Sequence, residues 1–309
     1  MSQPHFALVA PCFNEGQVAV RFLEELEQVL ARLPQRFTIV MVDDSSTDDT
    51  LSLLEAYRTK AANVSLRVIS LAYNLGHQEA IYQGLLFAGT LDAQRYIVMD
   101  SDGEDDPGAI AELVGITDSS IVLVARGKRS ESIGFQLGYW FYKRIFKIIA
   151  GRSISFGNYS MIDRRVLEAV LDRSFVHYAA FLSRQRAPQR IIVRDRRPRI
   201  DGHSKMSFRS LSIHAFRSLI EYSEEVLSIF LRGFIYLALI FLLCFIAIVF
   251  IKLFTTMAIP GWASVLSVSL FNSMLLCLGF FAIGLLLVNT AQRRERAGRH
   301  LYRTTGPTS

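Results

Sequence analysis

The stretch RYIVMDSDGEDDP, residues 95–107, joins a short apolar run to five carboxylates within seven positions. Residues 96–99 are apolar, as in a strand buried on both faces, and the acidic residues begin where that strand would end. In open α/β sheets, ligands bind outside the carboxyl ends of the parallel strands. The stretch therefore predicts a buried strand that ends at a binding rim.

Neighbouring segments repeat this pattern. Apolar runs occur at HFALVAP (5–11), FTIVMVDD (37–44), LRVISLAY (66–73) and SIVLVARG (120–127). Apolar residues recur at helical spacing from Phe22 to Leu33, and helical patterns also follow Asp49 and His77. Alternating strands and helices predict a Rossmann-like α/β fold with a mainly parallel sheet through about residue 130.

Polar clusters end all five predicted strands: PCFNEG, DDSSTDDT, AYNLGHQE, DSDGEDD and RGKR. Loops after strands are often polar, so one such cluster is weak evidence for a site. Five clusters at one edge of a sheet, one of them rich in carboxylates, favour a functional site.

The acidic stretch does not fit a calcium-binding EF-hand. A loop starting at Asp100 would need glycine at its sixth position and glutamate at its twelfth, where Asp105 and Ala111 stand. The Gly-x-Gly-x-x-Gly fingerprint of dinucleotide-binding folds and the phosphate-cradling Walker loop are also absent from the sequence. An Asp-x-Asp pair remains, Asp100 and Asp102, whose hard oxygens suit Mg²⁺ or Mn²⁺ bridging substrate phosphates.

The C-terminal part predicts a membrane anchor. Residues 233–251 contain no charged residue, and Arg293 is the first charged residue after Lys252. This leaves room for two helical spans, predicted as a hairpin over 229–292. The tail, 293–309, is rich in arginine, which together with the lack of a signal sequence predicts that the N-terminal domain and both termini lie in the cytoplasm.

Two further segments are predicted to contact the membrane surface. One is an interfacial helix at about 135–150, for which an ordinary helix packed on the sheet is the alternative. The other is a juxtamembrane amphipathic helix over 207–228, for which a plain connector is the alternative. The chain carries a net charge of +6, and its basic residues are concentrated near these apolar segments. Anionic lipid is therefore the expected partner, and nucleic acid is not. The three cysteines have neither metal-ligand spacing nor an evident disulfide pattern.

The chain resembles the polyprenyl-phosphate glycosyltransferases of glycosyltransferase family 2. The resemblance is carried by five segments in this order, followed by two spans: PCFNE, VDDSSTDDT, NLGHQEAIYQGLLFA, MDSDGEDDP and RIDGHSK. The resemblance covers almost the whole chain. It implies a GT-A fold over residues 1–206, a nucleotide-sugar donor, a polyprenyl phosphate acceptor and a divalent cation.

The resemblance assigns roles residue by residue. It implies that the donor is bound by Pro11, Phe13, Glu15, Val42, Asp43, Asp44, Asn74, Gly76, His77, Asp100, Ser101 and Asp102. It implies metal ligation by Asp100, Asp102 and Glu104, catalysis by Asp100, Asp102, Arg126, Arg199 and Lys205, and acceptor phosphate binding by Arg126, Ser204 and Lys205. Phe13, Glu104 and Ser160 stand where relatives commonly have tyrosine, glutamine and arginine. His77 is assigned to the donor site, because a lone histidine without an ordered partner is usually structural; a catalytic base is the alternative.

The resemblance implies inverting transfer of one sugar from a UDP- or GDP-linked donor to undecaprenyl phosphate, at the cytoplasmic face of a bacterial inner membrane. The acceptor phosphate is already anionic near neutral pH, so no strong base is needed. A processive polysaccharide synthase is disfavoured because SRQRAP lacks the Gln-x-x-Arg-Trp segment. A non-catalytic nucleotide-sugar sensor or membrane scaffold is the third alternative, and two spans leave homo-oligomer formation open.

Overall fold

The computed structural model describes residues 3–126, 156–173, 175–195, 197, 221–255, 261–293 and 300–305. These residues fall into two compact units, one built on a single β-sheet and one consisting of two long helices. The predicted interfacial helix at 135–150 and most of the predicted juxtamembrane helix lie outside the described residues.

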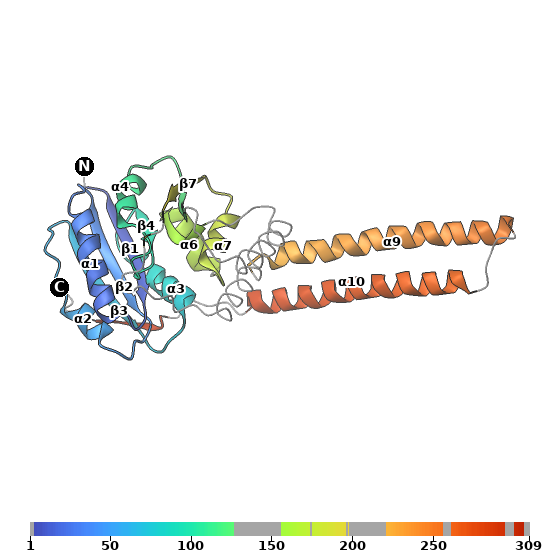
Figure 1. Ribbon diagram of the computed structural model, residues 1–309, viewed down its shortest axis with the longest axis horizontal. Helices are drawn as coiled ribbons and strands as arrows, with labels where there is room; N and C mark the ends of the chain where they lie inside the picture. The colour runs from blue at the N-terminus through green and yellow to red at the C-terminus, as the bar shows by residue number, and fades with distance from the viewer. Residues whose placement is uncertain are drawn as a thin grey trace. The chain divides into compact units, whose positions relative to one another are not determined.

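The first unit contains an eight-stranded sheet in the order β7-β5-β6-β4-β1-β2-β3-β8 (Figure 1). Its strands are β1 (His5–Cys12), β2 (Arg36–Asp43), β3 (Val64–Leu71), β4 (Arg95–Val98), β5 (Ile121–Arg126), β6 (Phe156–Asp163), β7 (Gln189–Arg194) and β8 (Tyr302–Thr305). β4, β1, β2 and β3 pair in parallel, as do β5 and β7, whereas β6 and β8 pair antiparallel to their neighbours. The predicted mainly parallel α/β sheet is confirmed.

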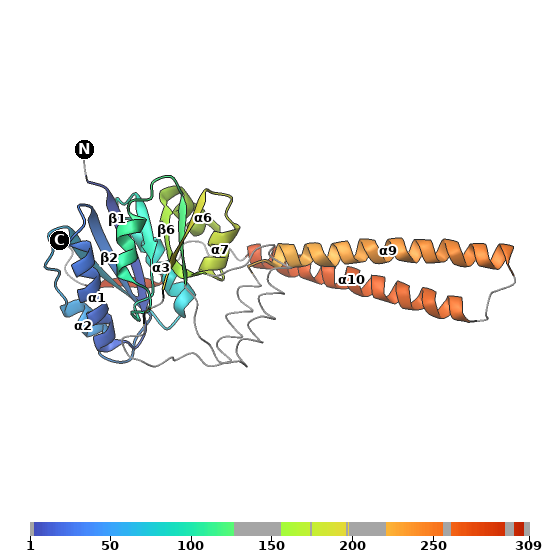
Figure 2. The ribbon, with the colours of Figure 1, turned by 45° about the horizontal axis from the view of Figure 1, so that its top comes forward.

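Helices cover both faces of the sheet (Figure 2). They are α1 (Gly16–Leu30), α2 (Thr50–Ala56), α3 (His77–Ala88), the 3₁₀ turn η1 (Pro107–Ala109), α4 (Ile110–Leu113), α6 (Arg164–Arg173) and α7 (Tyr178–Arg184). Apolar residues of α1, α2 and α4 form one buried cluster with the sheet, and those of α3, α6 and α7 form another. The helices after β1 and β2 lead to neighbouring strands of the sheet, whereas α3 leads from β3 back to β4, which pairs with β1.

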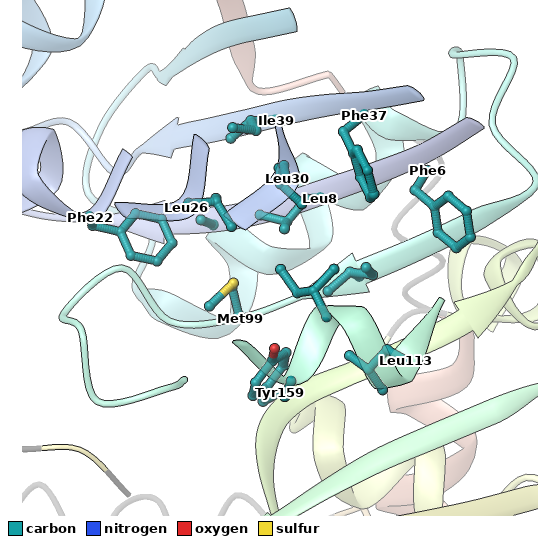
Figure 3. Close-up of a cluster of buried hydrophobic side chains, with 14 of the residues drawn as sticks. Phe6, Leu8, Phe22, Leu26, Leu30, Phe37, Ile39, Met99, Leu113 and Tyr159 are labelled. Carbon is teal, nitrogen blue, oxygen red and sulfur yellow. The ribbon is translucent and has the colours of Figure 1, made fainter. Parts of the chain in front are cut away.

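Strand β1 shows how the sequence divides between the two clusters. Successive side chains of a strand point to opposite faces. Phe6 and Leu8 accordingly join the cluster with α1, drawn in Figure 3, whereas Ala7 and Val9 join the cluster with α3. Because both faces are covered, nearly every residue of β1 is buried, which is why the strand reads as a continuous apolar run.

The second unit consists of α9 (Ser223–Phe254) and α10 (Trp262–Arg293). Residues 225–251 and 264–287 within them are long and apolar enough to cross a membrane by length and composition, with mean hydropathies of 3.2 and 2.3. Their apolar side chains are largely exposed.

The tail after α10 differs from the simple basic extension expected over 293–309. Residues 302–305 form β8, which pairs antiparallel with β3 at the edge of the sheet. The short segment YRTT carries too little periodicity to predict a strand, and its partner lies more than 200 residues earlier in the chain.

Candidate functional site

Hydrogen bonds between loops hold the ends of β1 and β2 together. Asn14, in the left-handed backbone region at φ +51°, accepts the backbone N–H of Thr47 with its Oδ1 at 2.8 Å. Its own N–H donates to Ser46 Oγ at 2.9 Å. The N–H groups of Glu15 and Gly16 donate to Thr50 Oγ1 at 3.0 and 2.7 Å. The loops after the first two strands therefore form one connected rim.

Asp44 connects this rim to the loop after β3. It is buried, and its two carboxylate oxygens accept the backbone N–H groups of Leu75 and Gly76 at 2.7 and 2.9 Å. Burial raises the pKa of Asp44, and the two backbone hydrogen bonds offset this only in part. Asp43 is also buried and accepts the Ser46 N–H and the Ser70 hydroxyl. Both residues thus shape the loops around the predicted donor site.

Ser101 joins the end of β1 to the acidic stretch. Its hydroxyl lies 2.6 Å from the carbonyl oxygen of Pro11 and 2.5 Å from Glu15 Oε2. The hydroxyl is buried between them. Pro11, Glu15 and Ser101, which were predicted to bind the donor, therefore meet at one place, although Ser101 follows Pro11 by 90 residues in the sequence.

The acidic stretch folds into a tight turn with a buried inner side. Asp102 Oδ1 accepts the N–H of Glu104 at 3.0 Å, and Asp105 Oδ2 accepts the N–H of Asp100 at 3.0 Å. Asp106 Oδ1 accepts the N–H of Gly108 and caps η1. Asp105 is not a solvent-exposed residue of this turn: its side chain is 5% exposed and fixes the backbone of Asp100.

His77 has ordered partners, contrary to the sequence-based interpretation. Its Nε2 atom lies 3.1 Å from Asp100 Oδ1 and 2.9 Å from Asn158 Nδ2. Burial alone would lower the pKa of His77. The carboxylate of Asp100, together with those of Glu15 and Asp102, outweighs this effect, so the pKa is raised above its ordinary value. The imidazole is therefore part of the acidic rim at the start of α3.

Asp100 and Asp102 offer the oxygen chemistry that a divalent cation requires. Mg²⁺ and its relatives are commonly held by one or two carboxylates together with substrate phosphates rather than by an all-protein cage. Among the described residues, no three His, Cys, Asp or Glu side chains are gathered as metal ligands. The two aspartates thus fit a cation shared with a diphosphate. Glu104 is buried beside Val124, Tyr159 and Arg194, and its role as a third ligand stays a prediction.

Other predicted site residues lie in different surroundings. Phe13 and Asn74 are exposed at the rim. Val42 is completely buried in the cluster with α3, so any contact with a nucleotide must come from its backbone. Arg126 ends β5, two strands from β4, and its side chain is outside the described part of the structure. Arg199, Ser204 and Lys205 also fall outside it.

Sequence reasoning missed two polar residues behind His77. Gln78 Oε1 accepts the N–H of Tyr178 at 2.6 Å, and Gln78 Nε2 donates to Asn158 Oδ1 at 3.4 Å. Asn158 lies on β6, a strand that the sequence patterns did not predict. The segment GNYS gives no local signal for such a role, because its function arises only when β6 pairs with β4.

Relatives of the chain are glycosyltransferases. It is 24% identical over 300 residues to the "Uncharacterized glycosyltransferase YkcC" of Bacillus subtilis, covering 90% of this chain and 87% of the relative. A shorter match, 32% identical over 108 residues, is to the "Dodecaprenyl-phosphate galacturonate synthase" of Rhizobium johnstonii, covering 35% of this chain and 31% of that protein.

Solved structures show the same fold. Mannosyl-3-phosphoglycerate synthase from Rubrobacter xylanophilus matches with a TM-score of 0.52 at 16% identity, covering 73% of this chain and 74% of the other. The mannosyltransferase PcManGT of Pyrobaculum calidifontis, in complex with GDP-Man and Mn²⁺, matches with a TM-score of 0.50 at 15% identity, covering 73% and 65%. These likenesses identify the sheet as a GT-A fold.

The sequence profile described as "Glycosyl transferase family 2" matches residues 7–174, more than half of the chain and the whole of the rim from β1 to the acidic turn. Family and fold agree with a rim built around an Asp-x-Asp pair. The chain therefore belongs to glycosyl transferase family 2 and is a glycosyltransferase with the GT-A fold.

Proposed function

We propose that this enzyme transfers a single sugar, with inversion, from a nucleotide-sugar to a polyprenyl phosphate at the cytoplasmic face of a membrane, with a divalent cation at Asp100 and Asp102. The observation that carries the proposal is the combination within one chain of a GT-A donor rim and two helices of membrane-crossing length. A relative named for dodecaprenyl phosphate, and a structural neighbour that binds GDP-Man and Mn²⁺, support the acceptor, donor and cation classes.

The rim provides the donor site. Pro11, Glu15 and Ser101 meet beside the acidic turn, and Asp44 orders the Leu75–Gly76 backbone. Asp100 and Asp102 would hold the cation, which stabilises the charge that develops on the departing diphosphate. Two carboxylates alone would repel a diphosphate, so the positive charge of the cation is what makes this rim a donor site.

The acceptor needs little activation. A phosphate monoester loses its second proton with a pKa of about 6, so it carries negative charge at neutral pH and can attack the anomeric carbon directly. Attack from the face opposite the diphosphate predicts inversion. Arg126, Ser204 and Lys205 are proposed to bind the acceptor phosphate, and Arg199 to stabilise charge during transfer, which offsets the repulsion between acceptor and donor phosphates.

The path of the chain supports a membrane hairpin with both ends on one side. The residues before α9 and the strand after α10 belong to the same sheet unit. A folded sheet cannot be divided by a bilayer, so α9 and α10 must enter and leave on the face where the sheet lies. The arginines that follow α10 favour the cytoplasmic face.

Transfer of radiolabelled sugar tests this function. The full chain in membranes would be incubated with Mn²⁺, undecaprenyl phosphate and a panel of UDP- and GDP-linked sugars, and the lipid extract analysed by mass and anomeric configuration. We expect one donor to give a glycosyl phosphate lipid carrying one sugar of inverted configuration.

Each other outcome has a definite meaning. Addition of many sugars would favour a polysaccharide synthase, and retention of configuration would contradict the in-line mechanism. Tight cation-dependent nucleotide binding without transfer from any donor would favour a nucleotide-sugar sensor. Asp118→Asn serves as a matched control, because that carboxylate is 72% exposed and pairs only with Arg190 in the ion pairs of the described residues.

A further inference from the structure

Glu221 stands where the sheet unit ends before the first apolar helix. Only Tyr222 separates it from Ser223, the first residue of α9. We propose that Glu221 is a positioning residue for the polyprenyl phosphate acceptor: its contacts with α7 fix the point at which the chain leaves the sheet unit for the membrane, so that the rim is held within reach of a lipid phosphate. This inference rests on the proposed function, since it concerns how the acceptor reaches the same site.

Both the side chain and the backbone of Glu221 bind the α7 region. One carboxylate oxygen, Oε2, accepts the backbone N–H groups of Val176 and His177 at 2.9 and 3.3 Å. The guanidinium group of Arg184, the last residue of α7, donates to the Glu221 carbonyl oxygen. N–H groups at the start of a helix lack partners within the helix, and a charged acceptor makes a strong hydrogen bond with them. Glu221 is therefore held from both ends of α7.

The helix that holds Glu221 is itself firmly packed. Tyr178, Phe181 and Leu182 are buried in the hydrophobic cluster with α3 and α6. Just before the helix, the Phe175 ring lies 5.2 Å from the Tyr178 ring and 5.9 Å from that of Tyr82 in α3, measured between centroids. Close-packed interiors of this kind resist displacement. A residue attached to α7 therefore takes a defined position on the sheet unit.

Gln78 attaches the same turn to the rim. Its Oε1 atom accepts the backbone N–H of Tyr178 at 2.6 Å, next in sequence after the two N–H groups that Glu221 binds. Gln78 is 6% exposed and is the second residue of α3, which begins directly after Gly76, whose N–H is held by Asp44. Three successive N–H groups are thus bound by one side chain from the rim and one from the residue that leads to α9.

The nature of the acceptor makes this connection important. A polyprenyl chain keeps its phosphate at the bilayer surface, because burial of its hydrocarbon in the membrane is favourable. Transfer requires the reacting atoms to come within about 3–3.5 Å of each other. A fixed exit point restricts the distances between the rim and that surface, whereas an acceptor dissolved in water can approach the rim without it. We therefore expect Glu221 to matter for a membrane-bound acceptor and not for a soluble one.

Two acceptors separate this role from a general structural one. Transfer by the full chain in membranes would be measured with undecaprenyl phosphate and with geranyl phosphate, which is short enough to dissolve in water. We expect Glu221→Ala to lower kcat/KM for undecaprenyl phosphate at least about 10-fold, since a misplacement of about 1 Å can cost about 100-fold in rate. The kcat/KM for geranyl phosphate and the KM for the donor should stay unchanged. Equal losses with both acceptors would overturn the inference.

Glu221→Gln and Glu168→Ala are the matched variants. A single oxygen of Glu221 accepts both N–H groups, so the amide oxygen of glutamine can replace it and most of the activity with undecaprenyl phosphate should be retained. An equal loss in Glu221→Gln and Glu221→Ala would contradict this. Glu168 is 67% exposed and pairs with Arg164 within α6, so its replacement by alanine should leave both acceptors unaffected.

Amide hydrogen exchange tests the contact without any sugar transfer. The N–H groups of Val176 and His177 should exchange faster in Glu221→Ala than in the wild type or in Glu168→Ala. Unchanged exchange would overturn the inference even where the wild type transfers sugar to lipid. Faster exchange in a protein whose wild type gives no lipid product from any donor would support the attachment of Glu221 to α7 and overturn the proposed function instead.

Discussion

Asp102 and Asp105 differ in role although only three positions separate them. Asp102 lies at the partly exposed part of the turn and accepts the N–H of Glu104. Asp105 is buried beneath the turn and accepts the N–H of Asp100. One carboxylate is therefore partly accessible, where we propose that the cation binds, and the other is buried and fixes the backbone of Asp100.

Asp102→Asn is expected to lower sugar transfer by at least about 100-fold, since one preorganised electrostatic group commonly contributes this much to a rate. The change keeps the size of the side chain and its acceptor for the Glu104 N–H, so the thermal unfolding temperature should stay close to that of the wild type. Turnover and thermal unfolding of Asp102→Asn and of the control Asp118→Asn would be measured together. Near-normal turnover in Asp102→Asn would disprove the cation assignment.

Glu27 illustrates a buried carboxylate with a structural role. Burial alone would raise its pKa, but hydrogen bonds from the Tyr57 hydroxyl and from the N–H groups of Ala61 and Lys60 outweigh burial and lower it. A lowered pKa in the folded state stabilises the protein above the unfolded-state pKa, and this contribution is lost as pH falls through the folded-state pKa.

Glu27→Gln should therefore lower the free energy of unfolding at pH 7 by about 1–3 kcal/mol, the usual loss when a charged hydrogen-bond acceptor is replaced. The difference from the wild type should be constant above pH of about 4.3 and shrink below it. Thermal and denaturant unfolding over a series of pH values checks this. Tyr57→Phe, which removes one of the hydrogen bonds, should show a smaller loss; a difference that grows in acid would contradict the assignment.

Strand β8 protects an edge of the sheet. Its backbone pairs with β3 from Val68 to Leu71, the Leu301 carbonyl accepts the N–H of Ala72, and the Tyr302 ring packs edge-on against Phe87 at 5.7 Å. Unpaired edge strands expose hydrogen-bonding groups and favour aggregation. The segment after α10 therefore contributes to the stability of the sheet unit.

Removal of residues 300–309 should increase amide hydrogen exchange in β3 and at Ala72, because these N–H groups lose partners or become accessible to water. Exchange followed by mass spectrometry would compare this truncation with Arg303→Ala, whose exposed side chain can be removed while the backbone pairing is kept. Unchanged exchange in β3 after truncation would show that β8 does not hold this edge.

The success of sequence reasoning depended on how local each signal was. The strands β1 to β5 and the meeting of Glu15 with Ser101 followed from apolar runs ending at one edge of a sheet. β6, β7 and β8 were missed because β7 is partly exposed, β8 is only four residues long, and β6 pairs with strands distant in sequence. The Asn158 contact with His77 depends on that long-range pairing, which no local pattern encodes.

At the scale of the whole molecule, one chain makes a folded sheet, leaves it for two apolar helices and returns to complete the same sheet. Strands that precede α9 and the strand that follows α10 in the sequence belong to one sheet, and one sheet cannot assemble from opposite sides of a bilayer. The residues between the helices are thus the part of the chain that we expect on the far side of the membrane.

Labelling of introduced cysteines tests this topology. Glu55→Cys, Arg303→Cys and Thr255→Cys place thiols in the sheet unit, in β8 and at the end of α9, in a background without Cys12, Cys244 and Cys277. A membrane-impermeant maleimide added to intact spheroplasts should label only Thr255→Cys, and the other two only in inverted vesicles. The physical reason is that β8 must lie with β3, on the side where the arginines after α10 are retained. Labelling of Arg303→Cys from outside would contradict both the pairing of β8 in the membrane and the cytoplasmic position of the donor rim.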